Sequence, residues 1–219
     1  MIHILFTFCD KKLEDEIFEY HLARLPEPMR RRIKKYRRWE DAHCGLFGKL
    51  LLIEGLKKYG IDEKKLKDML YTSYSRPYLR EVVDFNISHS GNGVVCALSE
   101  DCTVGIDIEE IKPLDIEDFR RQFTNRELTL MREAKDTYHE FYLWWTKKEA
   151  IIKADGKGLN IPLKAIDFPE EGLAEVNGRS WQIREIPLRD QYCCHLAFAG
   201  KPNVPVQVEP YSIGSPIDG

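Results

Sequence analysis

Hydrophobic and polar residues follow one another along this chain in a pattern that predicts both strands and helices. Short apolar runs and runs with a period of two indicate strands near residues 2–8, 82–88, 93–98, 103–109, 180–186 and 192–198. Apolar residues at helical spacing indicate helices over residues 12–24, 27–38, 40–59, 115–121, 125–134 and 137–155. Because strands and helices do not alternate as regular βαβ units, the pattern predicts an α+β fold.

Two further features mark the end of the last long helix and the start of a tail. Residues 155–159 read Asp-Gly-Lys-Gly-Leu, and glycines at these positions are typical of a helix end. Lys157 in this turn is a candidate for a phosphate contact. The tail after Pro202 carries three more prolines, so we expect it to be extended or loosely ordered.

The composition limits the class of protein. The 219 residues are 43% hydrophobic and 32% charged, which provides enough apolar side chains for one large core or two modest ones. A net charge of −3 argues against a general nucleic-acid-binding protein. The exception is a basic run at residues 30–38. As a helix, this run turns Ile33, Tyr36 and Trp39 toward a core and leaves its cations for solvent or an acidic protein partner.

The cysteines and the apolar runs indicate where in the cell the protein is located. Six cysteines show no Cys-x-x-Cys spacing, and Cys96 and Cys194 lie in apolar runs, so we expect buried, reduced thiols. No apolar run approaches the ~20 residues that span a bilayer, and no basic flank precedes the first strand. We therefore expect a protein of the reducing cytoplasm that has no membrane as partner. We also expect a monomer that has no nucleic acid as partner.

Three carboxylates and a lysine are the strongest candidates for chemistry. Residues 104–109 read Val-Gly-Ile-Asp-Ile-Glu, so Asp107 and Glu109 emerge on one side of a strand. Glu149 and Lys153 are four residues apart in a predicted helix and therefore lie on one face. Mg²⁺ prefers carboxylate and phosphate oxygens, so these side chains suit a magnesium ion bound to a pyrophosphate. They also fit a solvated strand edge with a surface ion pair.

A third polar segment precedes an apolar run. Residues 84–91 read Asp-Phe-Asn-Ile-Ser-His-Ser-Gly, and Val-Val-Cys-Ala-Leu follows at residues 94–98. Ser88 and His89 can donate hydrogen bonds to phosphate oxygens, His89 best when it is protonated. A turn cap is the alternative for this Ser-His pair.

These segments, in this order, resemble the hallmarks of the larger, Sfp-type class of 4'-phosphopantetheinyl transferases. The hallmarks are Asn-x-Ser-His-Ser at residues 86–90, Gly-Ile-Asp-x-Glu at 105–109 and Trp-x-x-Lys-Glu-Ala-x-x-Lys at 145–153. The likeness runs over residues 36–161 and continues more weakly beyond them. Each hallmark is moderately specific, and the ordered set is highly specific.

The resemblance implies a fold and a reaction. The fold is the 4'-phosphopantetheinyl transferase fold, α+β, with two similar α/β halves related by pseudo-twofold symmetry; here the halves would span residues 1–101 and 102–219. Enzymes of this class move the 4'-phosphopantetheine arm of coenzyme A onto a serine of an apo acyl or peptidyl carrier protein and release adenosine 3',5'-bisphosphate. They are holo-carrier-protein synthases. The implied cofactor is Mg²⁺, and the implied partners are coenzyme A and a carrier protein.

The resemblance also assigns roles to residues. Asp107, Glu109 and Glu149 correspond to the magnesium ligands, and Glu149 is also a candidate base for the serine hydroxyl. Lys153 corresponds to a pyrophosphate contact. Ser88 and His89 correspond to contacts with the coenzyme A phosphates on the nucleotide side. Glu127 corresponds to a further acidic position of the active site.

Two positions depart from the pattern of this class. Cys44 follows Asp-Ala-His, where members often carry an arginine that binds a coenzyme A phosphate, and a thiol cannot replace a permanent cation. That contact then falls to Arg30, Arg32 or Lys35, or binding is weaker. Ser-Arg-Pro stands where Gly-Lys-Pro is usual, and we expect Arg76 to keep the phosphate contact of the lysine that it replaces.

Two other functions fit the same residues. A coenzyme A or nucleotide binding protein that has lost transfer would explain Cys44, although all three carboxylates and Lys153 are retained. A magnesium-dependent pyrophosphohydrolase would cleave the same bond with water. Product analysis separates the three, because transfer consumes coenzyme A only when carrier is present, hydrolysis consumes it without carrier, and a binder consumes none.

Overall fold

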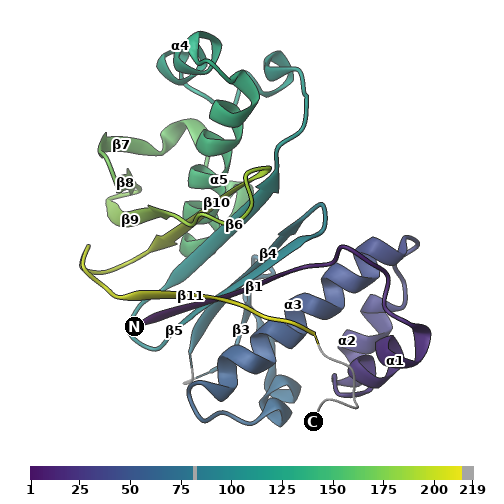
Figure 1. Cartoon of the computed structure of the whole chain (residues 1–219). Coiled ribbons are helices and arrows are strands. Elements are labelled where there is room, and N and C mark those ends of the chain that lie inside the picture. Colours follow the sequence, from purple (N-terminus) through teal and green to yellow (C-terminus); the bar gives the residue numbers. More distant parts are fainter. Residues whose placement is uncertain (81–82, 214–219) are drawn as a thin grey trace.

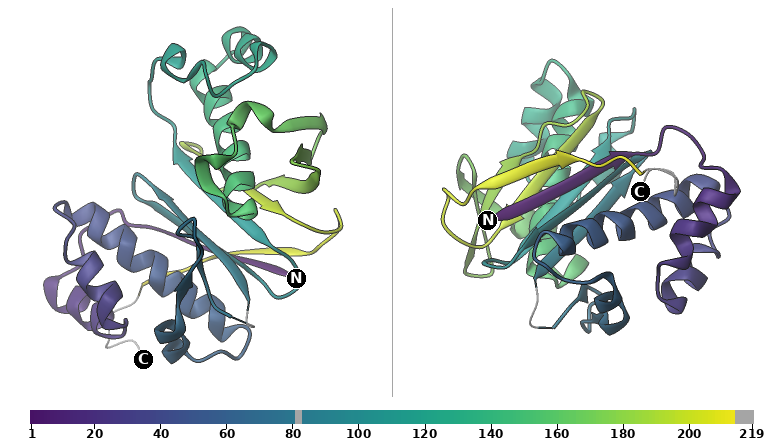
Figure 2. Two further views of the ribbon diagram at one scale, coloured as in Figure 1. Left: turned by 180° about the vertical axis from the view of Figure 1, so that it is seen from behind. Right: turned by 60° about the horizontal axis from the view of Figure 1, so that its bottom comes forward.

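The computed structural model describes residues 1–80 and 83–213, without the side chain of Leu159. The strands form two main sheets whose edges meet, and a long helix packs on each sheet (Figure 1). Figure 2 shows the two sheets and their helices in two further views, from behind and with the bottom turned forward. Helices and antiparallel strands are mixed without βαβ alternation, which confirms the predicted α+β fold.

The first sheet has the strand order β11-β1-β5-β4. Its strands are β1 (Ile2–Phe8), β4 (Asp84–Ser90), β5 (Gly93–Ser99) and β11 (Val206–Pro210). The second sheet has the order β6-β10-β9-β8-β7. Its strands are β6 (Val104–Glu110), β7 (Asp167–Glu170), β8 (Leu173–Val176), β9 (Arg179–Glu185) and β10 (Tyr192–Phe198). A separate hairpin consists of β2 (Leu70–Tyr71) and β3 (Pro77–Tyr78).

Helix α3 packs on the first sheet, with α1 and α2 against it, and α5 packs on the second sheet, with α4 against it (Figure 1). They are α1 (Asp15–Ala23), α2 (Glu27–Ile33), α3 (Trp39–Lys57), α4 (Asn125–Glu133) and α5 (Thr137–Asp155). Short 3₁₀ helices lie at Glu63–Asp68, Ile116–Phe119, Gly158–Asn160 and Leu163–Ala165. The long helices α3 and α5 confirm the predictions at residues 40–59 and 137–155 closely.

The predicted helix over residues 27–38 was too long. α2 ends at Ile33, which is buried as expected. The chain beyond it forms tighter hydrogen bonds, from the N–H of Lys35 to the carbonyl oxygen of Arg32 and from that of Tyr36 to Ile33. Tyr36 and Trp39 are 39% and 37% exposed, so the prediction that they face a core was wrong. The helix predicted over residues 115–121 is a single 3₁₀ turn.

The tail after Pro202 is extended over residues 206–210, one of the two predicted alternatives. β11 is extended, and it pairs in parallel with β1, starting with Ile2 opposite Val206. Pro205 precedes this edge strand and Pro210 ends it, positions at which a missing N–H is tolerated. The last proline of the sequence lies outside the described residues.

β11 also bears on how the chain is divided. This strand lies in the predicted second half, 102–219, but it pairs with the sheet of the first half, 1–101. The boundary near residue 101 and the pseudo-twofold symmetry stay predictions.

Polar side chains of β4 join the two sheets. Every second residue of β4 is polar, and these side chains accept the backbone N–H groups of every second residue of β6. The pairs are Asp84 with Val104 (2.7 Å), Asn86 with Ile106 (3.0 Å), Ser88 with Ile108 (3.4 Å) and Ser90 with Glu110 (3.2 Å). The edge of β6 thus has its donors satisfied by side chains instead of by another strand.

Gly105 allows α5 to pack directly on β6. A Cβ atom at this position would overlap the carbonyl oxygen of Ala150 and the backbone nitrogen of Ala154 on α5. Only a residue without a side chain fits this approach. The close packing holds Glu149 and Lys153 of α5 next to the carboxylates of β6.

We expect Gly105→Ala to lower the free energy of unfolding by about 1–3 kcal/mol, because the backbone of α5 must move to admit a methyl group. Urea unfolding followed by circular dichroism measures this change. An unfolding midpoint equal to that of the unsubstituted protein would contradict the close packing of α5 on Gly105.

The cysteines agree with the sequence prediction. All six are free thiols, and five of them are buried, Cys96 and Cys194 among them. Within residues 1–80 and 83–213, the helices are all too short or too polar to cross a membrane.

Candidate functional site

A cavity of about 420 Å³ lies between β6 and α5, and we call it the carboxylate cavity. Asp107 and Glu109 reach it from β6, and Glu149 and Lys153 reach it from α5, as their spacing predicted. The other lining residues are Ser88, His89, Gln122, Trp145 and Leu163. The structure therefore brings together the three predicted carboxylates, the predicted lysine and the Ser-His pair.

Lys153 is held against Asp107 by a short ion pair. Its ammonium group lies 2.6 Å from Asp107 Oδ1 and donates to Ser88 Oγ at 2.8 Å. Ser88 donates to Asp107 Oδ1 at 2.9 Å and accepts the N–H of Ile108 at 3.4 Å. The hydroxyl of Ser88 is thus fully used within the protein, and its contact with a phosphate stays a prediction.

The carboxylates share a space from which water is largely removed. Burial and, to a smaller extent, the charge of Asp107 raise the pKa of Glu109 to about 7. The same two causes raise the pKa of Glu149. Ser90 opposes them at Glu109 by donating a hydrogen bond at 2.6 Å. Lys153 neutralises one of three negative charges, so the cavity favours an additional cation.

The donor set of the carboxylate cavity fits a hard divalent cation such as Mg²⁺. Asp107 Oδ2 is buried and has no hydrogen-bond partner among the described residues, whereas buried polar atoms are nearly always paired. Within the same residues, no group of three or more His, Cys, Asp or Glu side chains is arranged to hold a metal ion. Asp107, Glu109 and Glu149 as magnesium ligands therefore stay a prediction.

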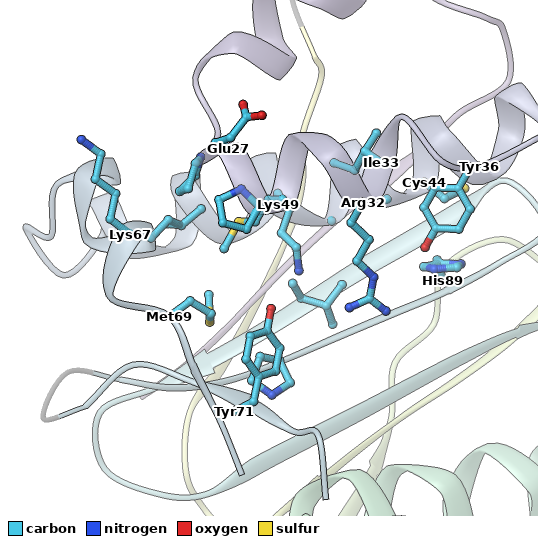
Figure 3. A pocket seen from close by; sticks show the side chains of 18 of the residues that line it. Glu27, Arg32, Ile33, Tyr36, Cys44, Lys49, Lys67, Met69, Tyr71 and His89 are labelled. Carbon is cyan, nitrogen blue, oxygen red and sulfur yellow. The ribbon is translucent and has the colours of Figure 1, made fainter. Parts of the chain in front are cut away.

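A second cavity, of about 560 Å³, lies between α2, α3, β4 and the β2–β3 hairpin (Figure 3). We call it the α2–α3 groove. His89 lines both cavities, so they meet at the end of β4. Of the three cations considered in place of an arginine at residue 44, Arg32 lines this groove. Arg30 pairs with Glu27 at 2.6 Å, and neither Arg30 nor Lys35 lines the groove.

Arg76 lines neither cavity and instead joins the two sheets. Its guanidinium donates to Asp84 Oδ2 at 2.7 Å and to the carbonyl oxygens of Val104 and Ala154 at 2.9 Å and 3.3 Å. These acceptors all belong to the protein. Arg76 thus has a structural role that the sequence did not indicate, because its partners are brought to it by the long-range packing of β6 and α5. Its contact with a phosphate stays a prediction.

We expect Arg76→Gln to lower the free energy of unfolding by about 1.5–3 kcal/mol, because charge-assisted hydrogen bonds between the sheets are lost. The Michaelis constant for coenzyme A should stay unchanged. Denaturant unfolding and steady-state kinetics on the same preparation measure both. A raised Michaelis constant for coenzyme A with an unchanged free energy of unfolding would support the predicted phosphate contact of Arg76.

Glu127 is buried and has a structural partner that the sequence did not indicate. Its carboxylate lies 2.8 Å from the ammonium group of Lys148, which is fully buried and also donates to the carbonyl oxygen of Leu163. Glu127 and Thr124 form a capping box at the start of α4. Glu127 does not line the carboxylate cavity, and its ion pair with Lys148 joins α4 to α5. Its place in the active site stays a prediction.

Lys157 follows α5 in the turn that was predicted to end it. Gly156 adopts φ = 80° there, as a helix C-terminus favours. Lys157 lies 3.6 Å from Asp155 and lines neither cavity, so its phosphate contact stays a prediction without support from this geometry.

The cavity residues that sequence reasoning did not single out include Lys49 and Trp145. Lys49 lines the α2–α3 groove, and the available signal was a lone charge in the otherwise apolar residues 46–53. Trp145 belongs to the aromatic group at residues 141–145 of α5, and it is half-buried and lines the carboxylate cavity. Phe141 is the member of that aromatic group that is fully buried.

Comparisons with known proteins cover most of the chain. The sequence model of the 4'-phosphopantetheinyl transferase superfamily matches residues 103–208. The chain is 34% identical over 161 residues to 4'-phosphopantetheinyl transferase Sfp of Bacillus subtilis (strain 168), which covers 71% of each chain. It is 32% identical over 171 residues to 4'-phosphopantetheinyl transferase gsp of Aneurinibacillus migulanus, covering 75% of this chain and 70% of that protein. The structure of Thermotoga maritima holo-[acyl-carrier-protein] synthase aligns with 46% of this chain and 64% of its own, with 21% identity and a TM-score of 0.35.

Proposed function

The chain belongs to the 4'-phosphopantetheinyl transferase superfamily, and we propose that it transfers the 4'-phosphopantetheine arm of coenzyme A to a serine of an apo carrier protein. The observation that carries this proposal is the meeting of Asp107, Glu109 and Glu149 with Lys153 in one cavity. A phosphoryl-type transfer needs positioning and charge neutralisation more than a nucleophile from the enzyme. These side chains supply both.

Transfer forms one bond and breaks one. The serine oxygen of the carrier attacks the phosphorus nearer to the pantetheine. The bond from that phosphorus to the bridging oxygen breaks, and adenosine 3',5'-bisphosphate leaves with that oxygen. The serine proton passes to a base. Negative charge grows on the leaving phosphate, and the ammonium group of Lys153 stabilises it from the edge of the cavity.

We include Mg²⁺ in the proposal, held by Asp107, Glu109 and Glu149. When bound, it would neutralise the pyrophosphate oxygens and balance the carboxylates. The raised pKa values of Glu109 and Glu149 support a cation at this place. So does Asp107 Oδ2, which has no hydrogen-bond partner among the described residues. Because a cation makes a bound carboxylate a weaker base, we assign Glu149 first as a ligand and only second as the base for serine.

The partners follow from the same reaction. Coenzyme A is the donor and an apo acyl or peptidyl carrier protein the acceptor. The exposed cations that follow α2 suit an acidic partner. The free, mostly buried thiols support a reducing, cytoplasmic location, and we propose that the protein acts there as a monomer without nucleic acid or membrane.

Product analysis tests this function. Coenzyme A and adenosine 3',5'-bisphosphate are quantified by chromatography, with and without apo carrier. Transfer predicts bisphosphate release only when carrier is present. Release without carrier would indicate pyrophosphate hydrolysis, and retained coenzyme A binding with no release would indicate a binding protein.

A further inference from the structure

An arginine joins the two sheets near the end of β4, and it lines neither cavity. Arg189 lies in the turn between β9 and β10 and donates to the two carboxylate oxygens of Asp10 at 2.8 Å and 2.7 Å. Its guanidinium carbon lies 3.7 Å from the centre of the Phe8 ring. Phe8 ends β1 and Asp10 follows it, so Arg189 links the second sheet to the first.

The turn between β4 and β5 belongs to the same group of contacts. The side chain of Asn92 donates to Asp10 Oδ1 at 2.6 Å and accepts a hydrogen bond from the hydroxyl of Tyr192 on β10. The backbone N–H of Asn92 donates to that hydroxyl at 3.3 Å, and its carbonyl oxygen accepts the N–H of Cys9 at 2.8 Å. We call Asp10, Asn92, Arg189 and Tyr192 the clasp.

The clasp is more than an ordinary surface ion pair, which contributes little to stability. Arg189 and Asp10 form two parallel hydrogen bonds, an arrangement that adds both strength and a fixed geometry. The Phe8 ring under the guanidinium adds a cation–π contact. The clasp therefore holds three segments together: the end of β1, the β4–β5 turn and the β9–β10 turn.

The clasp lies next to the part of β4 that reaches the carboxylate cavity. β4 ends at Ser90, directly before the turn. Ser90 accepts the N–H of Glu110 at 3.2 Å and donates to Glu109 Oε2 at 2.6 Å. A Cβ atom on Gly91 would overlap the carboxylate of Glu110 and the hydroxyl of Tyr192. The turn is thus packed tightly against β6 and β10, and Ser90 is held where it meets Glu109.

The two ends of β4 are anchored to the second sheet in different ways. At the start of β4, Arg76 bonds both Asp84 and the carbonyl oxygen of Val104 on β6. Beyond the end of β4, the clasp bonds Asn92 to Tyr192 and, through Asp10, to Arg189. Opening the clasp should therefore loosen the Ser90 end of β4 and leave the Asp84 end in place.

We propose that Arg189 and Asp10 are positioning residues for transfer: by closing the clasp, they hold Ser90 against Glu109 and keep this carboxylate turned into the carboxylate cavity. This inference rests on the proposed function. A carboxylate that acts on a pyrophosphate must lie in a narrow range of positions, so the residues that fix its hydrogen-bond donor affect the rate.

Substitution of Arg189 tests this role. We expect Arg189→Leu to lower kcat for transfer about 10-fold, because Glu109 is held less firmly in place. Arg189→Lys should lose less, since lysine keeps a charge opposite Asp10 but not the two parallel hydrogen bonds. Arg179→Leu is the control, because Arg179 is an exposed arginine of β9 that lies 3.4 Å from Asp155 of α5 and does not reach the first sheet. Its kcat should stay unchanged.

A double variant separates positioning from a general structural effect. If the clasp acts through Ser90, the variant with both Ser90→Ala and Arg189→Leu should transfer at the rate of Ser90→Ala alone. Independent effects would multiply instead. Multiplied effects, or a kcat within twofold of normal in Arg189→Leu, would overturn the proposal.

Hydrogen–deuterium exchange without substrates keeps one test independent of the reaction. Arg189→Leu should speed exchange of the backbone N–H groups of Glu110 and Asn92, and leave those of Val104 and Ile106 protected. Unchanged exchange at Glu110 and Asn92, or an equal increase at all four, would overturn the role of the clasp. The expected exchange pattern in a protein that does not transfer without any substitution would overturn only the proposed function.

Discussion

Asp107→Asn is expected to reduce the rate of transfer about 1,000-fold or more while the protein stays folded, because the carboxylate is central to the charge arrangement of the site. Asp107 pairs with Lys153 and accepts a hydrogen bond from Ser88, and its second, buried oxygen has no partner within residues 1–80 and 83–213. Asparagine has nearly the same shape but no charge, so it weakens both the hold on Lys153 and the attraction for a cation. Steady-state transfer rates and a urea unfolding curve measure the two effects.

A neighbouring carboxylate provides the matched control for Asp107→Asn. Glu110 follows on the same strand, but it pairs with Lys112 at 2.6 Å and does not line the carboxylate cavity. Glu110→Gln should therefore change the transfer rate less than about twofold, since exposed ion pairs contribute little. Two results would contradict the assignment of Asp107 to the active site. One is near-normal activity in Asp107→Asn, and the other is a loss of activity in Glu110→Gln as large as that in Asp107→Asn.

Glu127→Ala is expected to lower the free energy of unfolding by about 3–5 kcal/mol, because it leaves the fully buried ammonium group of Lys148 without its counter-ion. Burial already lowers the pKa of Lys148, and Glu127 opposes that shift. The backbone N–H of Thr124 loses its acceptor as well. Denaturant unfolding gives the size of the loss.

The double variant Glu127→Gln with Lys148→Met separates packing from catalysis. Removing both charges should recover most of the lost stability, because methionine fills the space of the lysine stem between Phe123 and Phe168 without a charge. If Glu127 acts in packing, the stable double variant transfers at a near-normal rate. A stable but inactive double variant would place Glu127 in the reaction.

The parts of this molecule that could be predicted from sequence are those with a local periodic signal. The alternation in residues 104–109 placed Asp107 and Glu109 in one cavity, and the four-residue spacing placed Glu149 and Lys153 there too. Long helices with many apolar residues were found at nearly the right bounds. β2, β3, β7 and β8 were missed because runs of two to four residues carry too little periodicity.

The parts that could not be predicted depend on partners far away in the chain. Arg76 meets Val104 and Ala154 only after β6 and α5 have packed, and Glu127 meets Lys148 only when α4 lies on α5. A charged residue looks the same in sequence whether it faces a ligand or a buried counter-ion. β11 was missed for the same reason, since its strand character comes from pairing with β1.

The mass of an intact apo carrier protein, measured after incubation with coenzyme A, Mg²⁺ and this protein, tests the central claim most directly. Transfer predicts a gain of one phosphopantetheine arm on the carrier that depends on Mg²⁺ and is lost with Asp107→Asn. An unchanged mass for every member of a panel of apo acyl and peptidyl carriers, from a folded protein that binds coenzyme A, would contradict it.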